Sequence, residues 1–89
     1  MTLDDFKFIK CLGSGGFSNV FLVRSAFNGK FYAMKLINKK FIIDSEREGI
    51  VENERYILGE VKSDFMTKLE FCFETNNHFV LVIECKNIY

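Results

Sequence analysis

Hydrophobic residues fall in five short segments that have the spacing of β-strands. Between residues 69 and 74, apolar and polar side chains alternate, which is typical of a strand with one buried face. Residues 79–83 are apolar almost without interruption, as expected for a strand at the centre of a sheet. We therefore expect strands over residues 6–12, about 19–25, about 30–37, 68–74 and 79–83. Turns are predicted at Asn28-Gly29 and at Thr75-Asn76-Asn77.

Residues 45–61 have the spacing of one amphipathic helix, inserted between the third and fourth expected strands. Its apolar stripe consists of Ile50, Ile57, Leu58 and Val61. Gly49 weakens the first turn, and residues 62–64 are expected to be irregular. The predicted fold class is therefore α+β, a five-stranded antiparallel sheet with one main helix. The 89 residues have room for one small domain only.

Two charged residues stand on otherwise apolar faces of these expected elements. Lys35 shares its strand face with the apolar residues Phe31, Ala33 and Ile37. Glu54 lies in the middle of the apolar stripe of the helix, whereas Glu46, Glu48, Glu52 and Glu60 lie mostly elsewhere on it. A carboxylate that faces a core needs a cation, so the sequence predicts that Glu54 pairs with Lys35. The alternative is that Lys35 extends out of a sheet edge into solvent.

A glycine-rich stretch joins the first two expected strands. It reads Leu12-Gly13-Ser14-Gly15-Gly16-Phe17-Ser18-Asn19-Val20. Gly13 and Gly15 leave room for a phosphate to approach backbone N–H groups. The motif Tyr32-Ala33-Met34-Lys35 follows, and its Lys35 lies fifteen residues after Val20. Glycine-rich hairpins are common structural features, but together these two motifs indicate a nucleotide site.

Composition limits the classes of function. The hydrophobic share of 48% and the eleven phenylalanines favour a packed core, and the formal net charge of zero gives no sign of nucleic-acid or membrane-surface binding. No apolar run is long enough to span a bilayer, and the acidic start does not resemble a signal peptide. Cys11, Cys72 and Cys85 lack metal-site spacing and are expected to be reduced thiols in a cytoplasmic protein. His78 beside the second turn is expected to be a surface residue without a catalytic task.

Taken together, the motifs resemble the small lobe of a eukaryotic protein kinase, most closely the AGC group of serine/threonine kinases. The resemblance runs from about Asp5 to Cys85 and rests on five segments. They are Asp-Phe before the first strand, Phe-Leu-Val-Arg in the second, Tyr-Ala-Met-Lys in the third, Asn-Glu-Arg-Tyr-Ile-Leu in the helix and Lys-Leu-Glu-Phe-Cys-Phe in the fourth strand. Ser18 replaces the third glycine of the G-x-G-x-x-G-x-V loop, a position that requires small size.

The resemblance implies that the chain is an ATP-binding lobe that ends at the hinge. Lys35 would hold the α- and β-phosphates of ATP, and Glu54 would fix Lys35. The glycine-rich loop would cover the nucleotide, with Leu12, Val20 and Ala33 forming an apolar roof over adenine. Ile83 would be the gatekeeper, and the Glu84 carbonyl and Lys86 amide would bind the adenine edge. Leu58 and Leu69 would belong to an internal spine joining the helix to the sheet.

The residues that complete a kinase do not occur in these 89 residues. There is no His-Arg-Asp, Asp-Phe-Gly or Ala-Pro-Glu motif, so neither the catalytic base nor the magnesium ligands are present. Three accounts stay open: a fragment of a longer kinase, which we favour, a non-catalytic binding module, and a split kinase whose large lobe is a separate chain. The chain alone is expected to be inactive.

A second kind of partner follows from the same resemblance. In the AGC group, a groove between the helix region and the sheet accepts an aromatic motif from a C-terminal tail. Phe41, Ile42 and Ile43 precede the expected main helix. They form either a short helix packed on the sheet, which we favour, or one wall of such a groove.

Overall fold

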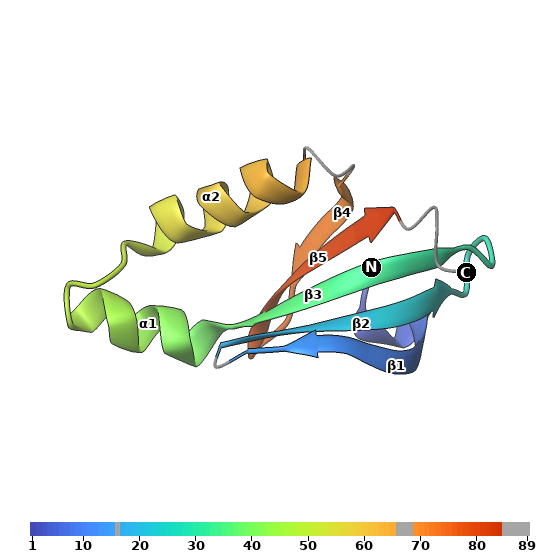
Figure 1. The fold of residues 1–89 in the computed structure, drawn as a ribbon, viewed down its shortest axis with the longest axis horizontal. Helices are drawn as coiled ribbons and strands as arrows, with labels where there is room; N and C mark the ends of the chain where they lie inside the picture. Colours follow the sequence, from blue (N-terminus) through green and yellow to red (C-terminus); the bar gives the residue numbers. More distant parts are fainter. Residues whose placement is uncertain (16, 66–68, 85–89) are drawn as a thin grey trace.

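The computed structural model describes residues 1–15, 17–65 and 69–84. In chain order, the elements are the 3-10 helix η1 (Leu3–Asp5), β1 (Phe6–Ser14), β2 (Ser18–Ser25), β3 (Phe31–Asn38), α1 (Lys39–Arg47), α2 (Asn53–Phe65), β4 (Leu69–Glu74) and β5 (His78–Glu84). The strands form one antiparallel sheet in the order β1-β2-β3-β5-β4, and both helices lie between β3 and β4 in the chain (Figure 1). The α+β fold class expected from the sequence is confirmed.

The turns take the positions that the sequence predicts. Gly29, in the turn between β2 and β3, has a φ of 71°, a left-handed conformation that favours glycine. At the β4–β5 turn, the Thr75 amide donates to the His78 carbonyl over 2.8 Å. His78 is half-buried as the first residue of β5. These two hairpins fix the register of two strand pairs, β2 with β3 and β4 with β5.

Each face of the sheet carries its own core cluster. The first cluster is made by buried residues of the strands alone, namely Phe6, Val23, Tyr32, Met34, Val80 and Val82. The second lies on the helix side and consists of Ile37, Ile42 and Leu81, with half-buried side chains of α1, α2, β4 and β5 packed against it. Since neighbouring residues of a strand point to opposite faces, β3 and β5 contribute to both clusters.

The helical region differs from the single helix predicted over residues 45–61. Helix α1 begins at Lys39, because the Asn38 side chain caps it by accepting from the amides of Lys40 and Phe41. It ends at Arg47, and Gly49 follows with a φ of 75°. Residues 62–64, expected to be irregular, continue α2 instead. Phe41–Ile43 therefore form part of a short helix, in which Ile42 is fully buried.

Candidate functional site

The glycine-rich loop joins β1 to β2 at one end of the sheet. Its turn is closed by a 2.8 Å hydrogen bond from the Gly15 amide to the Ser18 carbonyl. A Cβ built on Gly13 would meet no atom within 4 Å, and one on Gly15 would meet only the Ser18 carbonyl oxygen at 3.7 Å. Packing within the described residues therefore does not require glycine at either position, which leaves close approach of a ligand as a reason for it. Gly16 lies outside the described residues.

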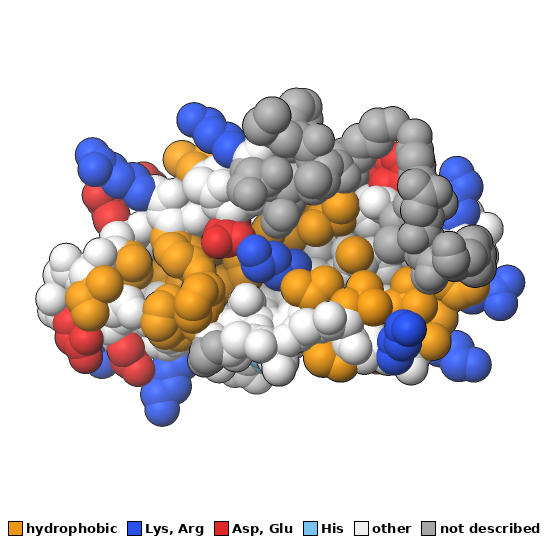
Figure 2. Space-filling view, in the orientation of Figure 1, with side chains coloured by type: hydrophobic (Ala, Val, Ile, Leu, Met, Phe, Trp, Pro, Cys, Tyr) orange, Lys and Arg blue, Asp and Glu red, His pale blue; other side chains and the backbone are white. Residues whose placement is uncertain are grey.

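Strand pairing gathers the predicted site residues on one face of the sheet. Val20 is paired with Lys35, and Ala33 is paired with Ile83. Paired residues share a face, and so do residues two apart in one strand, so all four side chains point to the helix side. Leu12 lies at the edge of the sheet with 47% of its surface exposed. Figure 2 shows hydrophobic side chains on this side of the molecule, interrupted by charged ones.

The end of β5 holds the predicted hinge group. Glu84 is half-buried, is the last residue of β5 and is paired with Tyr32. Lys86, the other predicted hinge residue, lies outside the described residues. The structure thus brings the glycine-rich loop, Val20, Ala33, Lys35 and Ile83 to one surface, with Glu84 at its far end.

Lys35 pairs with Glu60, which corrects the predicted pairing with Glu54. The Lys35 Nζ contacts a Glu60 carboxylate oxygen, and the two side chains are only 21% and 22% exposed. Glu54 is exposed on α2 and makes no ion pair in the described part of the chain. A half-buried carboxylate of the helix does neutralise Lys35, but it belongs to Glu60 and not to Glu54.

The error comes from the helix stripe. The residues of α2 that pack toward the sheet are Tyr56, Ile57 and Val61, and Glu60 shares their face. Leu58, which was assigned to the stripe and to the spine, is 57% exposed. Because a helix turns about 100° per residue, Glu54 and Glu60 lie about 120° apart around its axis. A stripe that includes Leu58 in place of Tyr56 is therefore rotated toward Glu54 and away from Glu60. Leu69, the other predicted spine residue, packs against the Ile37–Leu81 cluster.

Three aromatic side chains that the sequence reasoning did not bring together join the loop to the helices. Phe17 of the loop stacks on Phe41 of α1, with ring centroids 4.4 Å apart and planes inclined by 14°. Tyr56 of α2 meets Phe17 edge-on at 5.8 Å and Phe41 at 6.2 Å. The position of Tyr56 one turn before Glu60 was a readable signal that the two share a face. We call these three residues the loop–helix cluster.

The Tyr56 hydroxyl has an unusual environment within this cluster. Its oxygen is buried and has no hydrogen-bond partner among the residues that the structure describes. Burial raises the pKa of Tyr56 above its ordinary value, and the neighbouring charge of Glu60 raises it further. Tyr56 therefore remains neutral beside Glu60, and its ring rather than its hydroxyl makes the useful contacts.

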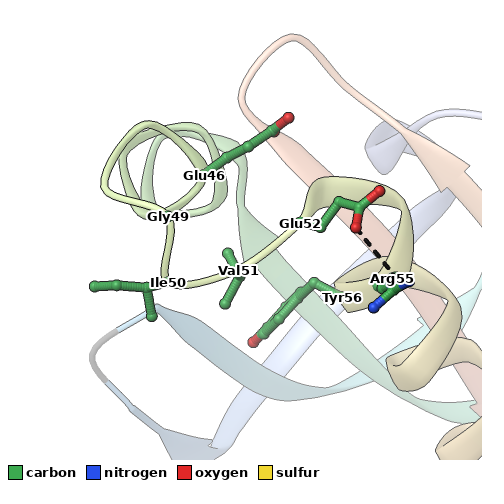
Figure 3. Close-up of a pocket in the computed structure, with 7 residues that line it drawn as sticks. All are labelled: Glu46, Gly49, Ile50, Val51, Glu52, Arg55 and Tyr56. Atoms are coloured by element: carbon green, nitrogen blue, oxygen red, sulfur yellow. Dashed lines mark ion pairs between the residues drawn. The ribbon is translucent and has the colours of Figure 1, made fainter.

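Two of the hollows beside the helices are lined in part by α2. One, of about 620 Å³, lies between the end of α1 and the start of α2, where Val51 and Tyr56 face a common space and Glu52 pairs with Arg55 over 3.3 Å (Figure 3). The other, of about 440 Å³, is mainly apolar and is lined by Asn53, Glu54, Ile57, Leu58 and Phe79.

The described residues show neither a metal-binding cluster nor a membrane-spanning helix. Over residues 1–15, 17–65 and 69–84, no three histidine, cysteine or acidic side chains come together closely enough to hold a metal ion. In the same ranges, no helix has the length and apolar character needed to cross a membrane. Cys11 and Cys72 are free and exposed. Partial burial of the Cys72 thiol, together with the charge of Glu74, raises the pKa of Cys72.

Comparison with known proteins gives consistent matches. The family model for the protein kinase domain matches residues 6–88. The chain is 36% identical over 87 residues to RAC-beta serine/threonine-protein kinase A of Xenopus laevis, and 34% identical over 87 residues to the human RAC-beta serine/threonine-protein kinase. Each match covers 98% of this chain and 18% of the relative. Protein kinase 3 of Dictyostelium discoideum is 34% identical over 84 residues, which are 94% of this chain and 9% of that protein. The chain thus spans less than a fifth of the length of these relatives.

Proposed function

Because the chain belongs to the protein kinase domain family, we propose that it forms the ATP-binding small lobe of a serine/threonine kinase of the AGC type. The observation that carries the proposal is the surface that joins the glycine-rich loop to Lys35. The open space around Gly13 gives phosphate groups access to loop amides, and Lys35 supplies a cation beside Val20. The half-buried side chains of Val20, Ala33 and Ile83 provide an apolar surface for adenine.

The residues fit a nucleotide, with one condition on Lys35. Its ammonium group has three donors, and Glu60 takes at least one of them. Phosphate oxygens would therefore either share the Lys35 ammonium with Glu60 or displace the Glu60 carboxylate from it. Glu60 keeps the half-buried cation neutralised without a nucleotide, which is the role that the sequence predicts for Glu54.

Titration with ATP tests the proposal. Since these residues cover one side of the nucleotide and the described part of the chain offers no metal cluster, we expect a Kd on the order of millimolar or weaker. Amide shifts should concentrate in the glycine-rich loop and in β3 near Lys35. Lys35→Ala should abolish them, whereas Lys7→Ala on exposed β1 should not. Micromolar binding that survives Lys35→Ala would refute the site assignment.

We further propose that residues 1–89 alone do not transfer phosphate. Phosphoryl transfer needs a metal, an oriented hydroxyl and a base, and its rate comes mainly from their positioning. Lys35 and the loop amides supply phosphate contacts, but Glu60 is committed to Lys35 and the printed sequence has no Asp-Phe-Gly motif. A purified chain should show no activity toward a basic serine peptide with magnesium-ATP. Lys35-dependent activity in material free of other kinases would contradict this, and activity only after adding a large-lobe chain would support a split kinase.

A second candidate function is peptide binding, favoured by the apolar hollow beside α2. Ile57, Leu58 and Phe79 line it, and the large exposure of Leu58 gives an incoming aromatic side chain a surface to cover. A Phe-containing tail peptide should bind there in trans, and Leu58→Glu should abolish binding while Ile43→Glu, an exposed isoleucine of α1, should not. Absence of binding by the folded chain would remove this candidate.

A further inference from the structure

The loop–helix cluster connects the proposed phosphate-binding loop to both helices. Phe17 is the only one of its three residues that belongs to the loop, while Phe41 and Tyr56 are fixed in α1 and α2. All three side chains are half-buried, and Phe41 and Tyr56 also pack against the Ile37–Leu81 core cluster. The rings of the helices are therefore anchored, whereas Phe17 is held in place mainly by them.

A backbone contact fixes the same point of the loop. The Asn38 amide donates to the Phe17 carbonyl over 2.9 Å, at the junction between β3 and α1. The Gly15–Ser18 hydrogen bond holds the turn of the loop together, and the Asn38–Phe17 hydrogen bond ties the loop to the start of α1. Such contacts lower the entropy that a flexible loop loses when it closes on a ligand.

We propose that Phe41 and Tyr56 are positioning residues for the glycine-rich loop, which they hold through Phe17 in the arrangement that a nucleotide phosphate requires. The proposal rests on the proposed function of the loop. It makes α2 responsible for both phosphate contacts, because Tyr56 holds the loop and Glu60, one turn later, holds Lys35. The rings bind no ligand themselves and act only through the loop.

The test uses variants that remove a ring but keep apolar volume. Phe41→Leu and Tyr56→Leu should raise the hydrogen-exchange rates of the Gly15 and Asn38 amides about two- to tenfold, the range expected for the loss of one aromatic pair. Tyr56→Phe keeps the ring and should behave as the wild type. Phe8→Leu is the matched control, because Phe8 packs on Phe21 at 5.2 Å, away from the loop–helix cluster.

Nucleotide binding separates positioning from a general loss of structure. In Phe41→Leu and Tyr56→Leu, affinity for ATP should fall about two- to tenfold, while affinity for adenosine, which has no phosphate, should stay unchanged. The proposal would be overturned if affinity fell equally for both ligands, or if Tyr56→Phe had as large an effect as Tyr56→Leu. Unchanged exchange rates would overturn it as well. If the wild-type chain binds no ATP, the proposed function fails, and the exchange rates alone then support or overturn ordering of the loop by the rings.

Discussion

The two faces of the sheet are built on different principles. The strand-only face is closed by fully buried apolar residues such as Met34, Val80 and Val82. The helix face combines an apolar cluster with a charged pair, half-buried aromatic rings and a hydroxyl that has no partner within the described ranges. The first arrangement maximises burial, whereas the second keeps polar groups near the proposed nucleotide surface. We infer that the strand-only face supplies most of the stability and the helix face supplies the chemistry.

The largest effect is expected from a cavity in the strand-only face. Met34→Ala should lower the free energy of unfolding by about 2–5 kcal/mol, because Met34 is fully buried. A domain this small has little stability to lose, so the variant should be largely unfolded. Chemical denaturation followed by circular dichroism measures the change. Ile57→Ala should lower the free energy of unfolding by less, because Ile57 of α2 is only half-buried. Equal losses for the two variants would contradict the inference that the strand-only face supplies most of the stability.

A smaller effect is expected from the charged pair of the helix face. Glu60→Gln leaves the Lys35 ammonium without its counter-charge and should cost about 1–2 kcal/mol of folding free energy. Glu54→Gln, on exposed Glu54, should stay within about 0.5 kcal/mol of the wild type. Denaturant titration of both variants decides which carboxylate neutralises Lys35. A larger loss for Glu54→Gln would restore the pairing predicted from the sequence.

Two glycines of the helix face should respond with opposite signs. Gly49 has a φ of 75°, so Gly49→Ala should cost about 1 kcal/mol through backbone strain. Gly59 lies inside α2, where an added Cβ would meet nothing within 4 Å, so Gly59→Ala should stabilise the chain by about 0.5–1 kcal/mol. Thermal unfolding of the two variants is the measurement. Stabilisation by Gly49→Ala would show that the break between α1 and α2 does not require glycine, and destabilisation by Gly59→Ala would contradict the open space at Gly59.

The smallest effect concerns the Tyr56 hydroxyl at alkaline pH. Because burial and Glu60 raise its pKa in the folded chain, the unfolded chain ionises first as the pH rises. The stabilising contribution is therefore present below the unfolded pKa of about 10 and is lost as the pH rises through the higher folded value. Tyr56→Phe should remove this part of the pH dependence and, having no unpartnered hydroxyl, should cost little stability at neutral pH. Stability measured from pH 8 to 11 checks both statements, and an unchanged alkaline slope would contradict them.

The strands and the candidate surface were predictable because they depend on short-range patterns. Alternation gives a strand its two faces, so Ala33 and Lys35 could be assigned one face from the sequence, whereas Val20 was placed beside them only through the family resemblance. Strand ends differed by only one or two residues, as at Ser14 and His78.

The helical contacts were less predictable, because several stripes fit one helix. Tyr56 and Leu58 are both large apolar side chains, and each defines a face that contains a glutamate. Only packing against the sheet distinguishes Glu60 from Glu54. The stacking of Phe17 on Phe41 joins residues that are 24 positions apart and belong to no common periodic pattern, so local spacing could not reveal it.

The residue Asn38 has a mechanical consequence. It ends β3, caps α1 and binds the Phe17 carbonyl, so strand and helix meet there without an intervening loop. A helix attached in this way cannot turn without twisting the central strand, which is paired on both sides. Between residues 39 and 65, regular helix is interrupted only over 48–52. Any swing of α2 is therefore concentrated at that break, with α1 serving as a rigid extension of the sheet from which α2 pivots.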